Sequence, residues 1–539
     1  MKKVFFFIFI VYILGASEFQ RFSFFGRRVG TFKIPAGKVK TVKGTTYLIK
    51  NGQSFKVNVI SLKKGERGFM FETTIKGTLS LYVYHLNGAL FINGKKFKGQ
   101  GWLSIPHKGR KLNIKIKGKG NAVLSDIFIN DSIREYIFLI SADTLRWDFV
   151  NEKITPNIVK FSKDSAVFTK TYSPSSWTLP AHMSVFTSKY PFEHGAYCRN
   201  DSLPDFESSL VEILSKYFFT YSLNGGMFVG ISHGFFRGFD IFTEYDNDLF
   251  NKFASEKLFK KAIESIKQMP VKRAFFFLHT YQIHSPYQCP GWGCKKGEKR
   301  TWMRFPEFLG GLNNMFMPVP EELRQNALQL YSDEVSYFDE WFGWFIDELK
   351  KMGIYRNSMI VLFSDHGEEF YDHEGWGHGH TLFNELIKVP LIVKYPYERV
   401  KSTINNSKSL IDIFPTIFKE YKIKPGVKLY GNPLDEHFQN EIYSTLLCPN
   451  IGRIPYQAAI IRGNRKLIVM HGGNFKDLKY RSGFLKDGAF LFDLSRDPFE
   501  CHPLKTEPAL KRRALELIRK FKRRGRAGEI EKLKALGYI

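Results

Sequence analysis

The stretch Tyr136-Ile-Phe-Leu-Ile-Ser-Ala-Asp143 decides the fold, because it joins an apolar run directly to a carboxylate. Such a run is typical of a strand that is buried on both faces of a parallel sheet. The aspartate stands where these sheets present their ligands, just outside the carboxyl end of the strand. The stretch therefore predicts a sheet that delivers a functional group at Asp143.

The same design recurs further along the chain. Arg273-Ala-Phe-Phe-Phe-Leu-His279 ends at a histidine, and Ser358-Met-Ile-Val-Leu-Phe-Ser-Asp-His366 ends at an Asp-His pair. Val389-Pro-Leu-Ile-Val-Lys394 is a fourth predicted strand, and amphipathic helices are predicted over about 252–268 and about 320–351. Strands that alternate with long helices predict a three-layer α/β fold with a largely parallel sheet.

Other regions flank this predicted core, which spans residues 133–425. Residues 18–132 alternate apolar and polar positions between Asn-Gly and Lys-Gly turns, as in a β-sandwich or jelly roll. Such a module either binds glycan or caps the core structurally, and both interpretations stay open. Residues 426–505 predict a small antiparallel subdomain, and 506–539 a basic helix. The basic face of that helix is either simply solvated or attracted to a membrane surface.

The chain is strongly basic and rich in aromatic residues. Its 539 residues include 80 Lys+Arg and 52 Asp+Glu, which gives a formal net charge of +28, and 53 Phe argue against disorder. Such a charge favours anionic substrates, polyanions or anionic membrane surfaces. No motif of a nucleic-acid-binding module accompanies it, so nucleic acid is not a predicted partner.

The first residues predict where the protein works. Lys2 and Lys3 precede the apolar run Val4–Leu14 and the small residues Gly15–Ser17, which is the pattern of a secretory signal peptide. The run is shorter than the roughly 20 residues of a spanning helix, although an uncleaved anchor is the rival interpretation. We therefore expect residues 1–17 to direct the protein out of the cytoplasm, as a periplasmic, secreted or membrane-anchored protein.

Five cysteines leave the disulfide pattern open. Cys289 and Cys294 bracket Pro-Gly-Trp-Gly, a tight loop that can close a disulfide in an oxidising compartment. The remaining Cys198, Cys448 and Cys501 do not supply the second pair that a zinc knuckle needs.

A segment that carries a threonine supplies the second half of the predicted site. Ser173-Pro-Ser-Ser-Trp-Thr-Leu-Pro-Ala-His-Met-Ser184 is predicted to run from a loop into a helix N-terminus near Thr178. Backbone N–H groups at such an end stabilise an anionic transition state. A divalent cation can hold a threonine hydroxyl as an alkoxide and polarise the ester oxygen under attack. Thr178 is therefore predicted to be a metal-held nucleophile, and the alternative is a helix cap.

Asp143, Asp365 and His366 each follow an apolar strand, so their side chains can converge on one metal ion. With Thr178 and without thiolates, the ligands are oxygen and nitrogen atoms. Such a set favours Zn²⁺ or Mn²⁺, with Mg²⁺ or Ca²⁺ as alternatives.

These motifs resemble those of the sulfatases in the alkaline phosphatase superfamily. The similarity spans about residues 136–539 and follows, in order, the segments around Thr178, His284, Asp365 and His378. It continues with Leu491-Phe-Asp-Leu-Ser-Arg-Asp-Pro-Phe-Glu500 and leaves out the N-terminal β region. The resemblance implies an alkaline-phosphatase-like three-layer sandwich with the β-sandwich and the small C-terminal subdomain attached.

The chain departs from the sulfatase pattern at positions that handle sulfate. Sulfatases convert a cysteine or serine to formylglycine, whereas the methyl group of Thr178 prevents formation of that aldehyde. Asp143-Thr144 replaces an Asp-Asp pair, and His182 replaces an arginine. His378 stands where a sulfate-contacting lysine is expected, and Asn224-Gly-Gly-Met227 replaces a Gly-Lys-Trp-His-like run.

The pattern is more similar to the threonine-nucleophile branch, which includes phosphodiesterases, phosphoethanolamine transferases and lipoteichoic acid synthases. This resemblance implies a metal-binding set of Asp143, Thr178, Asp365 and His366. It also implies that His284 and His378 hold a second metal or the substrate, and gives His279 and His380 weaker candidacies. His182 or His284 is expected to protonate the leaving group.

Three functions follow from these patterns. The favoured one is a metal-dependent hydrolase or transferase that acts on phosphate diesters of extracytoplasmic lipid or glycan. The second is a sulfate-ester hydrolase with an unmodified threonine, which the missing lysines disfavour. The third is an inactive glycan-binding protein that relies on the β module and the basic surface, and the retained metal and nucleophile positions disfavour it.

Overall fold

The computed structural model describes residues 19–22, 38–42, 45–50, 53–62, 66–72, 77–107, 111–130, 134–245, 254–287, 319–436, 441–448, 455–472, 488–506, 508–516 and 518–519. The predicted signal segment 1–17, Cys289, Cys294 and most of the basic segment 506–539 lie outside these residues. Across the described ranges, no helix combines the length and the apolar character needed to cross a membrane.

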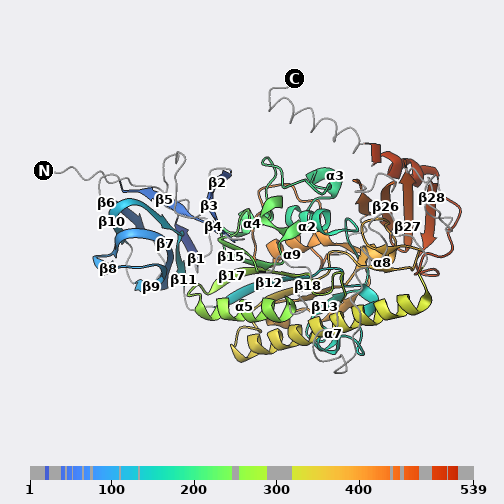
Figure 1. The fold of residues 1–539 in the computed structure, drawn as a ribbon, viewed down its shortest axis with the longest axis horizontal. Helices are drawn as coiled ribbons and strands as arrows, with labels where there is room; N and C mark the ends of the chain where they lie inside the picture. Colours follow the sequence, from blue (N-terminus) through green and yellow to red (C-terminus); the bar gives the residue numbers. More distant parts are fainter. Residues whose placement is uncertain are drawn as a thin grey trace, which may run out of the picture.

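An eleven-stranded sheet forms the centre of the molecule, in the order β2-β3-β4-β16-β15-β17-β12-β18-β22-β13-β23 (Figure 1). In its middle, β12 (Glu135–Ala142) lies between β17 (Arg273–Thr280) and β18 (Met359–Phe363), and both neighbours run parallel to it. All residues of β17 and β18 are buried, as expected of strands that are covered on both faces. The three strands that end at predicted site residues are therefore neighbours in one sheet.

The sheet is mixed rather than uniformly parallel, because some of the strands outside its centre run the other way. β22 pairs with β18 antiparallel, and β4 pairs with β16 antiparallel. The other strands of this sheet are β2 (Lys38–Val42), β3 (Thr45–Lys50), β4 (Gln53–Lys56), β13 (Ala166–Phe168), β15 (Phe219–Asn224), β16 (Ile241–Glu244), β22 (Leu391–Lys394) and β23 (Ser402–Ile404).

Helices cover both faces of the sheet, as Figure 1 shows. On one face, α5 (Ala254–Gln268) and α7 (Glu321–Lys351) share an apolar core with Phe138 and Ile140 of β12. On the other face, α2 (Thr178–Thr187) and α9 (Ile413–Glu420) share a second core with Ile137 and Leu139. Alternate residues of one strand thus face two helical layers, which is the predicted three-layer fold. The shorter helices are α1 (Pro156–Ser162), α3 (Pro191–His194), α4 (Leu210–Leu214) and α8 (Asn384–Ile387).

The N-terminal region contributes to two sheets. Eight of its strands form an antiparallel sheet that encloses its own apolar core, including Leu79, Leu90 and Ile114. Strands β2, β3 and β4 instead extend the edge of the central sheet through the β4–β16 pairing. The predicted boundary at residue 132 therefore does not separate two sheets. The eight strands are β1 (Phe19–Phe22), β5 (Asn58–Ser61), β6 (Glu66–Glu72), β7 (Gly77–Ile92), β8 (Lys95–Phe97), β9 (Gly101–His107), β10 (Lys111–Leu124) and β11 (Ile127–Asn130).

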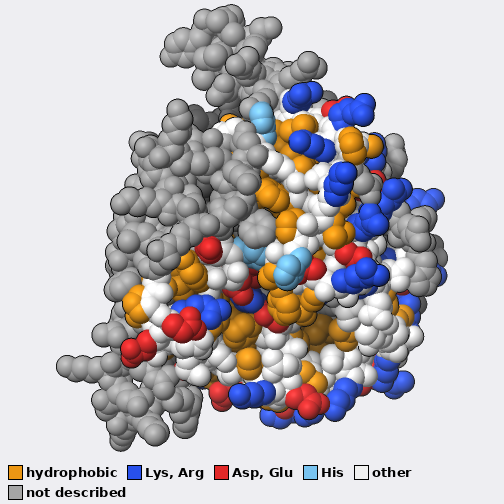
Figure 2. Space-filling view, turned by 90° about the vertical axis from the view of Figure 1, so that its right-hand side faces the viewer, with side chains coloured by type: hydrophobic (Ala, Val, Ile, Leu, Met, Phe, Trp, Pro, Cys, Tyr) orange, Lys and Arg blue, Asp and Glu red, His pale blue; other side chains and the backbone are white. Residues whose placement is uncertain are grey.

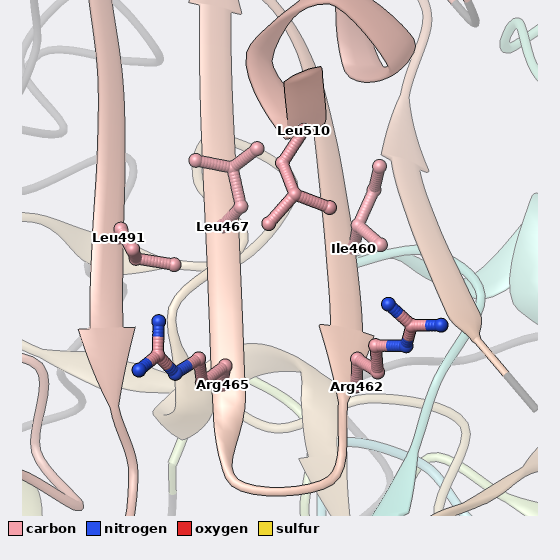
Figure 3. A pocket seen from close by; sticks show the side chains of 6 residues that line it. All are labelled: Ile460, Arg462, Arg465, Leu467, Leu491 and Leu510. Atoms are coloured by element: carbon pink, nitrogen blue, oxygen red, sulfur yellow. The ribbon is translucent and has the colours of Figure 1, made fainter. Parts of the chain in front are cut away.

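The C-terminal subdomain is a four-stranded antiparallel sheet, as the sequence predicts. Its strands are β25 (Ile442–Leu446), β26 (Tyr456–Arg462), β27 (Arg465–His471) and β28 (Gly488–Asp493). Residues 508–516 are helical and pack on this sheet through Ala514. A cavity of about 330 Å³ opens beside them, lined by Ile460, Arg462, Arg465, Leu467, Leu491 and Leu510 (Figure 3). Figure 2 shows this end of the molecule, where Lys and Arg side chains gather along one edge.

Candidate metal centre and nucleophile

The ends of two adjacent parallel strands bring three predicted ligands together. Asp143 follows β12, and Asp365 and His366 follow β18. One ligand atom from each of the three lies within 4.8 Å of the others, and all three side chains are completely buried. Residues that are more than 200 positions apart in the chain therefore form one compact group.

The charge of this group fits a divalent cation. Asp143 Oδ1 and Asp365 Oδ2 accept no well-aligned hydrogen bond among the described residues, and their imidazole contacts lie at 3.3 to 3.9 Å. Burial raises the pKa of Asp143, and repulsion from Asp365 raises it further. Burial also opposes the charge of Asp365, but His366 and His182 outweigh it and hold the pKa of that carboxyl below its usual range. Buried carboxylate oxygens without partners are unfavourable unless a cation neutralises them.

His366 is oriented for metal binding by its own backbone. Its Nδ1–H donates to the carbonyl of Gly367 at 2.8 Å, so the lone pair of Nε2 faces the carboxylates. Nε2 lies 3.4 Å from Asp365 Oδ2 and 3.9 Å from Asp143 Oδ1. A hydrogen bond from one ring nitrogen commonly fixes the tautomer of a metal-binding histidine. Gly367 is required here because a Cβ would lie 1.9 Å from the carbonyl oxygen of Glu385.

Thr178 faces the same group from helix α2, which covers one face of the sheet. It is the first residue of α2, and Trp177 occupies the N-cap position in an extended conformation. Thr178 Oγ1 lies 3.3 Å from His366 Nε2, and its hydroxyl is close enough to Asp143 to help lower the pKa of that carboxyl, against the larger effect of burial. The alternative role as a helix cap is therefore not supported, because the cap position belongs to Trp177.

His182 lies one helical turn below Thr178 and differs from its predicted role. Its Nδ1 is 3.0 Å from the carbonyl oxygen of Thr178 and 3.3 Å from Asp365 Oδ2, and its Nε2 is 2.9 Å from Ser141 Oγ. The ring is completely buried. Both nitrogens are engaged beneath the carboxylates, so a leaving group cannot reach them. We correct the expectation that His182 is a proton donor: its contacts position Asp365 and the start of α2.

His284 and His378 form a second pair beside the first group. Their ring centres are 5.0 Å apart, and the His378 ring is 4.4 Å from that of His366. His284 Nδ1–H donates to the carbonyl of Ser285 at 2.6 Å, and His378 Nδ1 contacts Glu368 Oε1 at 2.8 Å. Each ring thereby keeps Nε2 available. His378, predicted to hold a second metal or the substrate, stands next to the Asp143–Asp365–His366 group.

The charges of this histidine pair differ. Burial lowers the pKa of His284 to about 4, and the nearby His378 lowers it too. Burial also disfavours the charged form of His378, but Glu368 outweighs it and raises the pKa of that ring. Glu368 is completely buried and accepts a second bond from the Tyr287 hydroxyl at 2.6 Å. Sequence analysis assigned Glu368 no role, although its place two residues after His366 was the available signal.

His279 and His380 separate in space. His279 Nε2 is 3.2 Å from Asp143 Oδ2, and its Nδ1 accepts from the Gly225 N–H at 3.4 Å, so it orients one carboxylate of the candidate metal group. His380 Nε2 instead contacts Glu369 Oε2 at 2.7 Å, within a different buried network. Only proximity in the fold distinguishes these two weaker candidates.

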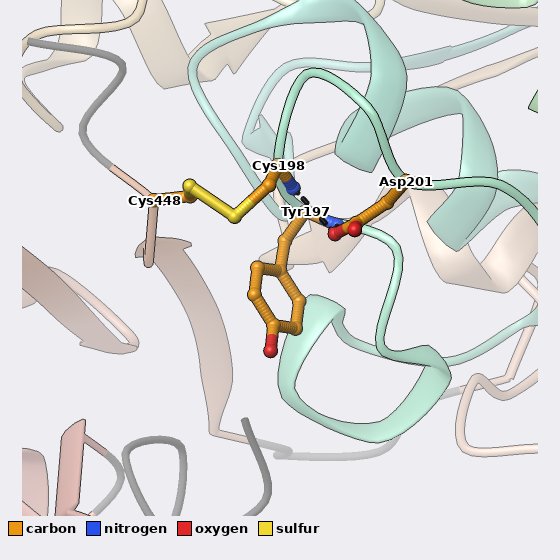
Figure 4. Close-up of a disulfide and its surroundings, with 4 residues drawn as sticks. All are labelled: Tyr197, Cys198, Asp201 and Cys448. Carbon is orange, nitrogen blue, oxygen red and sulfur yellow. Dashed lines mark hydrogen bonds between the residues drawn. A yellow bond between two sulfur atoms is a disulfide. The ribbon is translucent and has the colours of Figure 1, made fainter. Parts of the chain in front are cut away.

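A disulfide joins Cys198, just after α3, to Cys448, just after β25 (Figure 4). The carboxylate of Asp201 holds the same loop by accepting from the N–H groups of Tyr197 at 3.0 Å and Cys198 at 2.7 Å. The sequence separation of 250 residues gave no signal for this pairing. Cys501 is a free, exposed thiol.

A family model described as Sulfatase matches residues 135–420, which is more than half of the chain. The chain belongs to the sulfatase family. The resemblance found in the sequence is thereby confirmed at the family level, and the matched residues cover the central sheet apart from β2, β3 and β4, together with Asp143, Thr178, Asp365 and His366.

Curated relatives are distant. An ulvan-active sulfatase of Formosa agariphila is 25% identical over 320 residues, which are 53% of this chain and 60% of that protein. A low-salt glycan biosynthesis sulfotransferase, Agl7 of Haloferax volcanii, is 24% identical over 327 residues, which are 56% and 65%. The matched part of this chain thus spans less than two thirds of either relative.

Solved structures agree on the fold. A phosphonate monoester hydrolase of Agrobacterium radiobacter superposes with a TM-score of 0.56 at 15% identity, over 75% of this chain and 96% of that one. A protein in complex with its substrate D-glucosamine-2-N,6-O-disulfate gives 0.55 at 15% identity, over 72% and 98%. The predicted alkaline-phosphatase-like α/β fold is confirmed.

Proposed function

We propose that this sulfatase-family protein is a metal-dependent hydrolase or transferase of phosphate diesters, with Thr178 as the nucleophile. One observation carries the proposal: an unmodified threonine hydroxyl lies 3.3 Å from His366 Nε2, in a buried group with Asp143 and Asp365. Thr178 cannot be converted to formylglycine, and His182 stands where the sulfatase motif has an arginine. The chain therefore lacks two groups that sulfatases use on sulfate esters.

Asp143, Asp365, His366 and Thr178 are the residues that would hold the cation, and His378 lies beside them, with its ring 4.4 Å from that of His366. Zn²⁺ or Mn²⁺ is favoured by the nitrogen and oxygen donors, with Mg²⁺ or Ca²⁺ as alternatives. A bound cation supplies Lewis acidity, which lowers the pKa of a coordinated hydroxyl and polarises the ester oxygen.

The chain's own residues then perform the displacement. Thr178 Oγ1 would lose its proton toward the neighbouring Asp143 carboxylate, and the same proton returns to Thr178 when it is displaced from phosphorus. A bond forms between Thr178 Oγ1 and phosphorus while the bond from phosphorus to the leaving oxygen breaks. The N–H groups at the start of α2, where Thr178 is the first residue, would stabilise the negative charge of the reacting phosphoryl group.

The leaving oxygen needs a proton, and the half-buried histidine pair is placed to give it. The raised pKa of His378 makes this ring the better donor, whereas the pKa of about 4 for His284 suits a base. Water, or an acceptor hydroxyl in a transferase, then displaces Thr178 from phosphorus, and His284 Nε2 can take the incoming proton.

Sulfate-ester hydrolysis is the second candidate. It is favoured by the name of the Formosa agariphila relative and by the bound sugar disulfate in the superposed structure. The same threonine would attack sulfur in place of phosphorus. The substrate is in either case an anionic ester.

We also propose an extracytoplasmic location. The Cys198–Cys448 disulfide supports it, since such bonds persist in oxidising compartments. Basic side chains along the C-terminal end support contact with an anionic lipid or glycan surface (Figure 2).

A panel of aryl phosphodiesters and aryl sulfates, turned over by the metal-loaded protein, tests the proposal. We expect phosphodiester turnover that falls roughly 10³-fold or more in Thr178→Ala, and a phosphate adduct on the Thr178 peptide by accurate-mass spectrometry. Thr178→Ser keeps the hydroxyl and is the matched control. Sulfate turnover that survives Thr178→Ala, without phosphodiester turnover, would contradict the proposal.

A further inference from the structure

The C-terminal sheet packs against different partners on its two faces. Ile461 and Ile468 share an apolar core with α2 and the central sheet. Ile460 and Leu467 lie on the opposite face and share a separate core with Ala514. Neighbouring residues of a strand point to opposite faces. The cavity lined by Ile460 and Leu467 therefore opens on the side turned away from the helix that carries the nucleophile (Figure 3).

An apolar row crosses three strands beneath this cavity. Ile460 is directly opposite Leu467, and Leu467 is directly opposite Leu491, so their side chains lie on one face. The partly buried Leu510 comes from the helical residues 508–516 and completes the apolar lining (Figure 3). Leu504 is bridged to Leu491 and is 47% exposed, so the apolar surface continues from the cavity to solvent.

The row nearest the hairpin turn is basic instead of apolar. Arg462 and Arg465 are directly opposite each other, and both are exposed. Like charges in this arrangement are destabilising, so a bound anion would relieve their repulsion. Asp493 is opposite Arg465, but its carboxylate accepts from the N–H and the hydroxyl of Ser495. Arg462 forms no ion pair within the described part of the chain, which leaves the turn end of the cavity cationic.

The surroundings of the turn add further positive charge. Lys170 Nζ donates to Asn464 Oδ1 at 2.8 Å, and Asn464 belongs to the turn between β26 and β27. Other Lys and Arg side chains gather at this end of the molecule (Figure 2). A surface of this charge attracts anionic membranes and repels cationic partners.

The lining of the cavity fits a ligand that has both an apolar and an anionic part. Its volume of about 330 Å³ is near the lower end of the range of about 300–1,000 Å³ for small-molecule sites, which suits a single chain. An apolar chain would remove the leucine and isoleucine side chains from water. A guanidinium binds phosphate through parallel N–H groups. Free phosphate would leave the apolar row unused, and a neutral lipid would leave the arginines unused.

We propose that this cavity binds one anionic phospholipid of a membrane surface. An acyl chain packs on Ile460, Leu467 and Leu491, and the phosphate of the headgroup pairs with Arg462 and Arg465. The bound lipid holds the C-terminal end of the molecule against the membrane. The site is separate from Thr178, so the inference goes beyond the proposed function and depends on no step of its chemistry.

Calorimetric titration of the full-length, metal-loaded protein tests the site. The probe is octanoyl lysophosphatidylglycerol, kept below the concentration at which it forms micelles. We expect saturable binding that is at least about tenfold tighter than that of octanoyl lysophosphatidylcholine, and at least about tenfold tighter than that of glycerol 3-phosphate, which has no chain. Flotation with phosphatidylglycerol vesicles, compared with phosphatidylcholine vesicles, checks the same preference on a bilayer.

Paired variants separate the cavity from the general charge of the protein. Arg462→Gln with Arg465→Gln should weaken lysophosphatidylglycerol binding at least about tenfold. Lys511→Gln with Arg512→Gln removes the same charge from exposed positions of the neighbouring helix and should keep the affinity. Leu510→Trp fills the cavity and should also abolish binding, and an unchanged melting temperature shows that this variant folds.

Each contrary result overturns the proposal. An equal loss in the two paired variants would show a nonspecific charge effect. Equal affinity for glycerol 3-phosphate would make the cavity a phosphate site, and equal affinity for the choline lipid would show that the arginines do not select the headgroup. Absence of saturable binding would exclude the lipid. Because the titration involves no turnover, its result is independent of whether the protein hydrolyses phosphodiesters.

Discussion

Two groups of buried carboxylates in this protein differ in whether the protein supplies cations to balance them. In the metal centre, Asp143 and Asp365 face each other and contact imidazoles, without a lysine or arginine among their described contacts. In the network under the C-terminal subdomain, Lys466 Nζ lies 2.7 Å from Glu500 Oε1, and both side chains are completely buried.

A histidine completes the balance of the second group. His373 Nδ1 contacts Glu385 Oε1 at 2.7 Å. Burial disfavours its charge, but Glu385 outweighs burial and raises the pKa of His373 to about 10. The network therefore carries its own cations and joins the catalytic core to the C-terminal sheet. The contrast teaches that the negative charge left in the metal centre is a binding determinant for a cation, since the fold can balance buried acids elsewhere.

The largest expected effect comes from removing one carboxylate of the metal centre. Asp365→Asn should lower turnover about 10³-fold or more, because the cation loses a ligand and His366 loses its partner. It should also abolish the rise in melting temperature on adding Zn²⁺ or Mn²⁺, which for the wild type corresponds to about 2.7 kcal/mol at 100 times the Kd. Calorimetric melting with and without metal checks this, with exposed Asp347→Asn as the control. If Asp365→Asn kept the metal stabilisation, Asp365 would not be a binding determinant for the cation.

The next effect concerns the balanced network. Lys466→Met leaves Glu500 buried without its cation, and we expect a loss of about 3–5 kcal/mol in the free energy of unfolding. Adding Glu500→Gln should restore part of that loss. Urea unfolding measures both, and Lys505→Met, at an exposed position, is the matched control. A change below about 1 kcal/mol would mean that the pair is not the structural counterpart described above.

The smallest effect is a pH dependence carried by His373. Its folded pKa of about 10 exceeds the unfolded value of about 6.5, so its stabilisation is complete below pH 6.5 and is lost as pH rises through 10. The free energy of unfolding should therefore fall by about 1–3 kcal/mol between pH 7 and 10. His373→Gln should flatten this slope, whereas His502→Gln, whose side chain is 89% exposed, should not. An equal slope in wild type and His373→Gln would refute the assignment.

The sequence predicted what local patterns encode. Apolar runs that end at Asp143 and Asp365 predicted the buried strands and the polar residues that meet at their ends, because both are encoded in adjacent residues. Thr178 was predicted for the same reason, since its segment also encodes the helix start.

Other features depend on contacts through space. His279 and His380 look alike in the sequence, yet one contacts Asp143 and the other Glu369. The burial of His182 and the pairing of β4 with β16 depend on how distant segments pack, which no local pattern records.

The Cys198–Cys448 disulfide also has a consequence for biosynthesis. The thiol of Cys198 has no partner until the ribosome has added 250 more residues and the end of β25 has been made. Closure of this bond therefore requires that the nucleophile segment and the C-terminal sheet have met. The disulfide can therefore form only in a chain whose two segments have been synthesised and packed together. A chain that stops before residue 448 keeps Cys198 as a free thiol.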